Sequence, residues 1–169
     1  MSVQCIKLAH EFEVGGEPEF GVEVIIHVLD AVVARDPGTI NDHGHGDFFE
    51  RFEAGSFFET APAGGDLYLL KNITHDWDDT RAVTILSKCR EAMSVHATVL
   101  VFDRLLPERA ECGRNVDTYL IDLEMLTLAP NGRERTRREM EMLFSRAGFV
   151  LTNVLTTASS LCIIEGRPA

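Results

Sequence analysis

The pattern of apolar and polar positions predicts a chain that alternates short buried strands with amphipathic helices. Apolar runs at 22–26, 67–70 and 98–102 have the length and the β-branched or aliphatic composition of buried strands. From Asp78 to Met93 apolar residues instead recur at helical spacing, and acidic residues open the segment, as the positive end of a helix dipole favours. This order predicts an α/β domain whose mostly parallel sheet is covered by helices.

The last third of the chain predicts two more helices followed by two strands. Thr136 with Glu139 three residues later has the spacing of a capping box, and Gly148 is placed to end that helix. We expect the two strands to form an antiparallel pair at an edge of the sheet. The predicted elements are helices at 115–128 and 136–147 and strands at 149–154 and 161–165.

The first fifty residues are patterned more weakly. Gly15, Gly16 and Pro18 interrupt any regular element there, so we expect a poorly patterned segment at 1–20 and one folded domain at 21–169. A chain of 169 residues is long enough for one sizeable core and short for two full domains. Further patterns predict a helical turn at 31–34, a polar, glycine-containing loop at 37–47 and a strand at 52–58.

Composition and charge narrow the class of protein. Hydrophobic residues make up 45% and charged residues 25%, as in an ordinary globular protein, and the formal net charge is −11. An acidic chain repels nucleic acid and anionic lipid. The one dense basic run, 133–138, is interleaved with Glu134, so we interpret it as a helix start with solvated charges. We therefore predict no nucleic-acid partner.

Targeting signals and cysteine spacing bear on the compartment. No apolar run reaches the ~20 residues that span a bilayer, and the N-terminus has no secretion signal, so we predict no membrane partner. The four cysteines include no CxxC pair, and Cys89 and Cys162 fall on apolar faces where buried thiols are common. These features predict a cytoplasmic protein.

The segment Asp66–Asp79 holds the best candidate for chemistry. Its apolar strand is followed within a few residues by His75, which Asp76 and Trp77 flank. In an open α/β sheet, ligands bind outside the carboxyl ends of the strands. Because a histidine exchanges protons near neutral pH, His75 is a candidate acid or base at such a strand end.

A metal site is the other chemistry that the sequence invites. The run Asp42-His-Gly-His-Gly-Asp47 alternates residue types that can ligate metals. Such alternation in a glycine-containing loop is more often solvated polar sequence than a ligand set. We therefore predict no metal site.

Seven short motifs occur in an order and spacing that point to one family. They are Gly55-Ser-Phe-Phe-Glu59, Leu70-Lys-Asn-Ile-Thr-His-Asp-Trp-Asp-Asp79, Val101-Phe-Asp-Arg-Leu-Leu-Pro107, Asp122-Leu-Glu-Met-Leu126, Gly132-Arg-Glu-Arg-Thr136, Ala147-Gly-Phe149 and Ile164-Glu-Gly166. Together they resemble the S-adenosylmethionine-dependent O-methyltransferases that act on plant phenolics and bacterial polyketides. The resemblance runs from about Arg51 to the end, and more weakly over 21–50.

The resemblance implies roles for individual residues. His75 matches the general base that takes a proton from the substrate hydroxyl, and Asp103 and Glu134 match the two acids that flank it. A carboxylate beside an imidazole fixes its tautomer and stabilises the imidazolium. The matching positions for S-adenosylmethionine are Ser56, Phe57 and Lys71, and those for the acceptor are Met125, Asp122 and Trp77.

Two features of the family are missing from the sequence. Family members have a first strand and a glycine-rich Asp-x-Gly-x-Gly loop that cradles the cofactor, whereas Gly15-Gly16 follows no predicted strand here. After the strand at 22–26 the family places an acid for the ribose, and His27 and Val28 stand there instead. The resemblance thus implies an incomplete Rossmann-like domain at 21–169, lacking the first strand and the loop.

Three functions are compatible with this pattern. The first is methyl transfer from S-adenosylmethionine to a hydroxyl of an aromatic or polyketide-like small molecule. The second is a truncated, catalytically silent relative that binds a small molecule, or one half of a split enzyme. The third uses the pocket for cyclisation or hydrolysis. Because a missing strand exposes a sheet edge, we also expect a homo-oligomer or a partner chain that supplies the missing elements.

Overall fold

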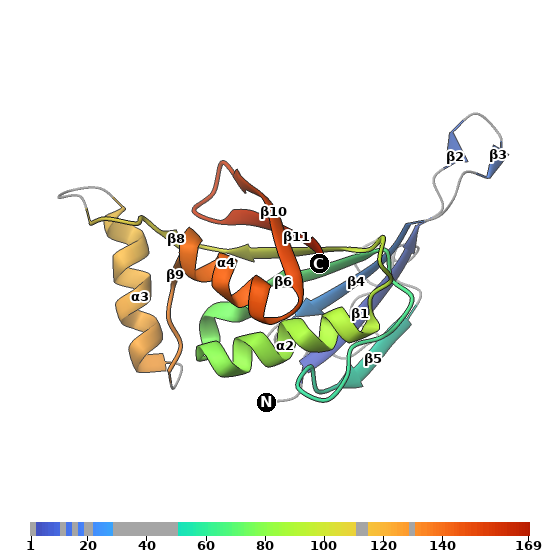
Figure 1. Cartoon of the computed structure of the whole chain (residues 1–169), viewed down its shortest axis with the longest axis horizontal. Helices are drawn as coiled ribbons and strands as arrows, with labels where there is room; N and C mark the ends of the chain where they lie inside the picture. The colour runs from blue at the N-terminus through green and yellow to red at the C-terminus, as the bar shows by residue number, and fades with distance from the viewer. Residues whose placement is uncertain are drawn as a thin grey trace, which may run out of the picture.

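The computed structural model places one large β-sheet at the centre of the chain, with two helices packed along one face (Figure 1). It describes residues 3–10, 13–14, 17–18, 22–28, 51–110, 115–128 and 131–169. Within these, side chains are described for 56–110, 115–127 and 131–169. The predicted turn at 31–34 and the predicted loop at 37–47 lie outside the described residues.

The main sheet has the strand order β10-β11-β7-β6-β4-β1-β5 in the described part of the chain. The neighbours β4, β6 and β7 run parallel, and every other pair in this sheet is antiparallel. The prediction of a mostly parallel sheet is therefore wrong for strand pairing, whereas the antiparallel pair at the edge is confirmed. The strands are β1 (Val3–His10), β4 (Val22–Val28), β5 (Arg51–Gly55), β6 (Leu67–Lys71), β7 (Thr98–Asp103), β10 (Phe149–Thr156) and β11 (Cys162–Pro168).

Strand β1 occupies a stretch where the sequence predicts no regular element. It pairs antiparallel on both sides, with Ile6 opposite Ile26 of β4 and Phe52 of β5. Beyond it, β2 (Glu13–Val14) and β3 (Glu17–Pro18) pair with each other, so Pro18, which weakened the prediction, belongs to a short strand. Hydrogen bonding to two neighbours stabilises a strand whose local pattern is ambiguous.

Strand β5 is shorter than the strand predicted at 52–58. After Gly55 the chain turns, and the Ser56 carbonyl accepts from the N–H groups of Glu59 and Thr60 at 2.9 and 3.1 Å. Phe57 is nevertheless 2% exposed, because it packs into the core from this turn. The apolar pair thus belongs to the core without belonging to the sheet.

The three predicted helices are confirmed to within two residues at each end. They are α2 (Asp79–Ala92), α3 (Val116–Leu128) and α4 (Arg137–Arg146). The capping box at Thr136 and Glu139 is formed as predicted, and Gly148, at φ +81°, follows α4 in the left-handed region. Within the described ranges, none of the helices is long and apolar enough to cross a membrane.

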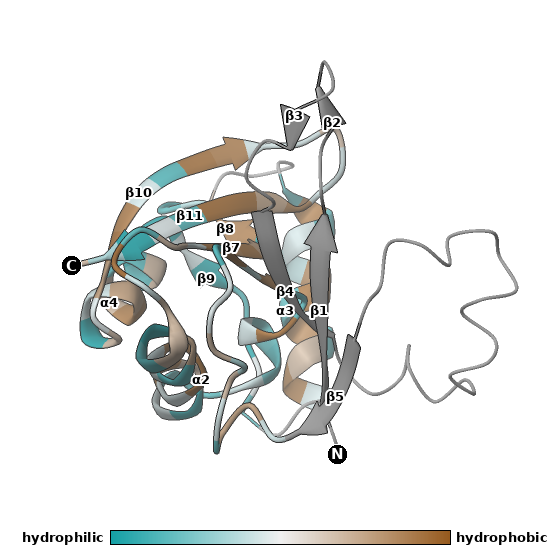
Figure 2. Cartoon of the chain, turned by 90° about the vertical axis from the view of Figure 1, so that its right-hand side faces the viewer, coloured by the Kyte–Doolittle hydropathy of each residue, from teal (hydrophilic) through white to brown (hydrophobic). Residues whose placement is uncertain are grey.

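The core lies between the sheet and helices α2 and α4. Every second residue of β6 and β7 is buried, and Tyr68, Leu70, Val99 and Val101 are 0% exposed. Helix α3 lies apart from this core, beyond the end of the sheet and beside β8 (Leu105–Leu106) (Figure 1). Hydrophilic residues lie on the outward sides of α2 and α4 (Figure 2). The buried helix residues of this core are Ala82, Ile85, Leu86 and Cys89 of α2 and Met140, Leu143 and Phe144 of α4.

Candidate active site

The carboxyl ends of β6 and β7 lie side by side because the two strands are parallel neighbours. Just after β6, the N–H of Asn72 donates to the Phe102 carbonyl at 3.0 Å, and a φ of +53° at Asn72 turns the chain out of the sheet. Asparagine is among the few residues that adopt this conformation readily. A short 3₁₀ helix, η2 (Thr74–Asp76), follows and holds His75 at this edge of the sheet.

His75 is 7% exposed and has a carboxylate on each side of its ring. Its Nδ1 lies 3.0 Å from Oε1 of Glu134, and its Nε2 lies 3.6 Å from Oδ1 of Asp76. An ionised carboxylate only accepts hydrogen bonds, so the contact with Glu134 assigns the proton of the neutral ring to Nδ1. Nε2 then carries the lone pair and can accept a proton.

The charges around His75 favour its protonated form. Burial lowers the pKa of His75, but the hydrogen bond to Glu134 and the charges of Asp103, Glu134 and Asp76 raise it. The net result is a pKa above the ordinary value of 6.5. The site is therefore built to stabilise an imidazolium, as a general base requires once it has taken a proton.

Asp103 reaches the site through Thr74. It is 2% exposed, and its Oδ2 accepts a hydrogen bond from the Thr74 hydroxyl, whereas Oδ1 has no partner among the described residues. Burial raises the pKa of Asp103 to about 6, although His75 and Thr74 both act to lower it. The predicted flanking acids thus differ: Glu134 contacts the ring, and Asp103 acts on it through space and through the neighbouring residue.

The pairing of two short strands brings Glu134 to His75. Strand β9 (Arg135–Thr136) pairs parallel with β8, which follows β7 closely along the chain. This pairing holds Glu134, the residue before β9, near the carboxyl end of β7. The N–H of Glu134 donates to Oδ1 of Asp122 at 2.8 Å. Asp122, matched by resemblance to the acceptor side, therefore holds the backbone of Glu134 from helix α3.

The other sequence-predicted residues are distributed unevenly around this centre. The rings of Phe57 and Phe58 pack edge-on against Trp77, at centroid distances of 6.0 and 4.8 Å. Ser56 accepts from the N–H of Phe58 at 3.3 Å, in the same turn. Lys71 is exposed at the end of β6, and Met125 is half-buried on α3.

Sequence reasoning missed two residues at this site, Thr74 and Arg135. Both are buried, at 1% and 2% exposed. The prediction of solvated charges at 133–138 is wrong for Arg135, whose guanidinium bonds Asp79 and two backbone carbonyls. Their position in the sequence could have indicated them, because Thr74 directly precedes His75 and Arg135 directly follows Glu134.

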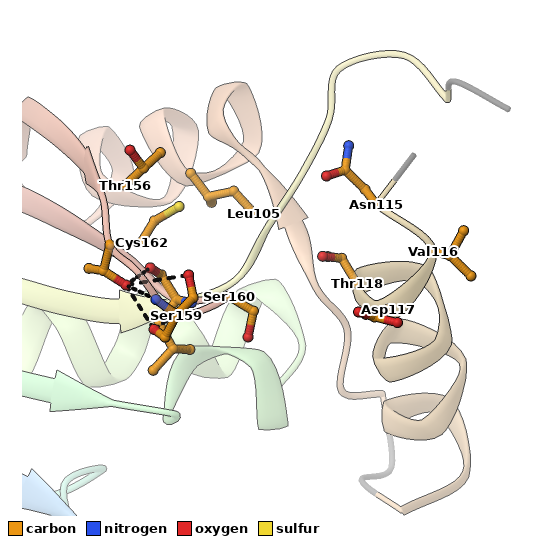
Figure 3. A pocket seen from close by; sticks show the side chains of 11 residues that line it. Leu105, Asn115, Val116, Asp117, Thr118, Thr156, Ser159, Ser160 and Cys162 are labelled. Atoms are coloured by element: carbon orange, nitrogen blue, oxygen red, sulfur yellow. Dashed lines mark hydrogen bonds between the residues drawn. The ribbon is translucent and has the colours of Figure 1, made fainter. Parts of the chain in front are cut away.

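A pocket of about 620 Å³ lies between the start of α3 and the turn that joins β10 to β11 (Figure 3). Its lining includes Thr157 and Ser159 but not His75. Figure 3 shows hydrogen bonds, drawn as dashed lines, around Ser159 in this turn. Thr157 Oγ1 contacts Ser159 Oγ at 2.7 Å and donates to the Leu161 carbonyl at 2.8 Å. Because these hydroxyls serve the turn, the pocket is a weaker candidate than the His75 centre.

Several known proteins that are similar to this chain are O-methyltransferases. The model of the O-methyltransferase domain matches residues 19–150. O-methyltransferase SfmM3 of Streptomyces lavendulae is 47% identical over 114 residues, 66% of this chain and 34% of the relative. Phenazine O-methyltransferase PhzM of Lysobacter antibioticus is 45% identical over 68% of this chain and 32% of its own length. The chain thus spans about a third of the length of these relatives.

Solved structures agree with the sequence relatives. The crystal structure of LaPhzM has a TM-score of 0.72 and 41% identity, over 78% of this chain and 38% of that one. The neocarzinostatin-biosynthesis O-methyltransferase NcsB1, solved with S-adenosylmethionine and 2-hydroxy-5-methyl naphthoic acid, has a TM-score of 0.59 and 34% identity, over 68% of this chain and 32% of that one. By its sequence and by its α/β fold, the chain belongs to the O-methyltransferase domain family.

Proposed function

We propose that this chain carries the acceptor-activating side of an S-adenosylmethionine-dependent O-methyltransferase site, within a Rossmann-like domain. The observation that carries the proposal is the 3.0 Å contact between Nδ1 of His75 and Oε1 of Glu134, which leaves Nε2 to accept a proton. In this proposal His75 takes the proton of a hydroxyl on an aromatic or polyketide-like small molecule. Glu134 and Asp103 stabilise the imidazolium that results.

The physical need for a base follows from the acceptor. A phenolic hydroxyl has a pKa near 10, so little of it is ionised at neutral pH, and the neutral oxygen is a weak nucleophile. In this proposal Nε2 of His75 would hold the proton that the hydroxyl gives up, and the oxygen would thereby become a better nucleophile. A positioned general base contributes about 10²–10⁴-fold to such a step.

S-adenosylmethionine, when bound, supplies a methyl group on a positively charged sulfur. Two residues at the end of β6 fit the polar part of this molecule: Lys71 is exposed, and the buried amide oxygen of Asn72 has no partner among the described residues. An ammonium group can satisfy that oxygen, and a carboxylate can pair with the lysine. Phe57 fits an adenine contact poorly, because its ring is 2% exposed.

The acceptor class is inferred from the relatives. NcsB1 was solved with a hydroxylated naphthoic acid, which supports a fused aromatic acceptor for this chain. In the proposal Met125 contacts the acceptor, since a thioether packs well against an aromatic face. Trp77 is assigned the same side of the site, next to His75 in sequence.

The proposal is tested on the purified chain in two steps. Calorimetry with millimolar S-adenosylmethionine comes first, and an absence of binding would overturn the chain as an independent enzyme. Transfer of a labelled methyl group to a panel of naphthols and phenols follows. We expect His75→Gln to lose about 10²–10⁴-fold of the rate, and His96→Gln, at an exposed histidine, to retain it. Equal rates in the two variants would remove His75 as the base.

A second candidate is a catalytically silent relative that binds an aromatic ligand, or half of a split enzyme. It is favoured by one observation in the sequence: His27 and Val28 stand where the family places an acid for the ribose of the cofactor. Binding of a naphthol without binding of S-adenosylmethionine would support the silent binder. Size-exclusion chromatography with light scattering separates a monomer from the homo-oligomer or partnered chain that we also propose.

A further inference from the structure

Three consecutive residues grip the turn that carries His75. The N–H of Arg133 donates to the His75 carbonyl at 2.7 Å, and the Glu134 carboxylate lies 3.0 Å from Nδ1 of the ring. Arg135 completes the set, donating to the carbonyl of Thr74 from Nη1 and to the carbonyl of Trp77 from Nη2, both at 2.7 Å. Ring and backbone of the turn are thus held by one short segment.

The Arg135 guanidinium is committed to this turn. It is 2% exposed, and its Nε also donates to Oδ1 of Asp79, at the start of α2, at 3.0 Å. Burying a guanidinium is costly unless its charge is paired and its donors are used, and both conditions are met here. Because the fork is planar and rigid, it fixes the two carbonyls on either side of His75 relative to the helix that follows.

We propose that Arg135 is a positioning residue that holds the imidazole of His75 in register with Glu134. This rests on the proposed role of His75 as the base, and it adds a residue that touches neither substrate nor cofactor in that role. Arg135 and Glu134 are neighbours, and β9 fixes the segment by pairing Arg135 with Leu105. The pairing of β8 with β9 therefore fixes the position of Glu134 and, through Arg135, the position of the turn that contains His75.

The sign of the change in the pKa of His75 discriminates positioning from simple charge. Removing a nearby cation raises the pKa of an imidazole, because its charged form is repelled less. Releasing His75 from Glu134 lowers that pKa, because the hydrogen bond and the charge of Glu134 both raise it. Positioning by Arg135 therefore predicts a fall where electrostatics alone predicts a rise.

The test is an NMR titration of the His75 ring in the full chain, with the signal assigned by its loss in His75→Gln. The variants are Arg135→Gln and the charge-preserving Arg135→Lys. In both we expect the pKa of His75 to fall, and the Nδ1 proton to exchange at least about tenfold faster. Arg137→Gln is the matched control, at an exposed arginine paired with Glu141 in the same run.

Each outcome decides the inference. An unchanged or raised pKa of His75 in a folded Arg135→Gln or Arg135→Lys chain overturns it. If neither variant folds, Asp79→Asn removes the outer anchor of the guanidinium at a half-exposed site. Faster exchange of the Nδ1 proton in that variant supports positioning, and unchanged exchange overturns it.

Activity is read separately. If the wild-type chain transfers methyl groups, Arg135→Lys should lower kcat with little change in KM, because the substrate does not contact Arg135. If the wild-type chain transfers none, the proposed function fails while the titration still decides whether Arg135 positions the ring.

Discussion

The hydroxyl of Thr74 donates a hydrogen bond to Oδ2 of Asp103 and so joins the turn before His75 to the end of β7. Both residues are buried, and burial raises the pKa of Asp103 to about 6 from its ordinary value of 3.8. The hydrogen bond acts in the opposite direction, because it stabilises the ionised carboxylate. Thr74 therefore lowers the pKa of Asp103 and favours its ionised form, whose charge raises the pKa of His75.

The first prediction concerns this hydrogen bond. Thr74→Val keeps the shape of the side chain and removes the donor, so the buried carboxylate of Asp103 loses its partner. We expect the free energy of unfolding at pH 7 to fall by about 1–3 kcal/mol, measured by urea denaturation. Thr74→Ser keeps the hydroxyl and is the control; equal stability of the two variants would contradict the prediction.

The second prediction concerns pH and Asp103. Between about pH 4 and 6 the folded protein holds a proton that the unfolded chain releases, so this group makes stability fall as pH rises. The rise in pKa from 3.8 to about 6 corresponds to about 3 kcal/mol. We expect the free energy of unfolding of Asp103→Asn, relative to that of the wild type, to be higher at pH 7 than at pH 4 by about this amount. Urea denaturation at the two pH values measures it. A stability difference that is independent of pH would contradict the assignment.

The third prediction concerns the pKa of His75 itself. Glu134→Gln removes a carboxylate that raises this pKa both by hydrogen bonding and by charge, so the pKa should fall. In the wild type a raised pKa gives stability that is present below pH 6.5 and is lost as pH rises through the folded value. Glu134→Gln should lose the share of this stability that Glu134 contributes, whereas Asp103 and Asp76 still raise the pKa of His75. NMR titration of His75 measures the change, and an unchanged pKa would show that Glu134 does not hold the ring.

The fourth prediction concerns a close contact in the core. A Cβ added at Gly166 of β11 would overlap the ring of Phe144 and lie 3.1 Å from Cγ1 of Val99. Phe144 is 0% exposed and cannot move into solvent, so we expect Gly166→Ala to cost about 1–3 kcal/mol. Thermal unfolding measures this loss. Adding Phe144→Leu to Gly166→Ala should cost less than the sum of the two single changes, and simple additivity would rule out the clash.

Local pattern was enough to locate most regular elements. Helix α2 begins and ends within one residue of its prediction, because Asp78 caps it and accepts from the N–H of Arg81 at 2.9 Å. Strands β6 and β7 were found because each is a short, continuous apolar run; the burial of every second residue became visible only in the structure. Such signals act over a few residues and are legible in the sequence.

Which strands pair, and in which direction, could not be predicted from local patterns. Strand β1 was missed, and the sheet is mixed rather than mostly parallel, because the direction of a neighbour depends on which distant segment docks beside a strand. Phe57 was taken as part of a strand, since hydropathy records that a residue is buried and not which element carries it there.

The sequence by itself determined the strand end that carries His75 and, through the family's motifs, the identity of its two acids. Only the tertiary structure decided how they act: Glu134, 59 residues away, contacts the ring, whereas Asp103 is held by Thr74. It also showed that Arg135, predicted to be a solvated charge, is buried and donates to the turn that contains His75. The reason is physical: hydrogen bonds between distant segments depend on the register of β8 with β9, which no local pattern encodes.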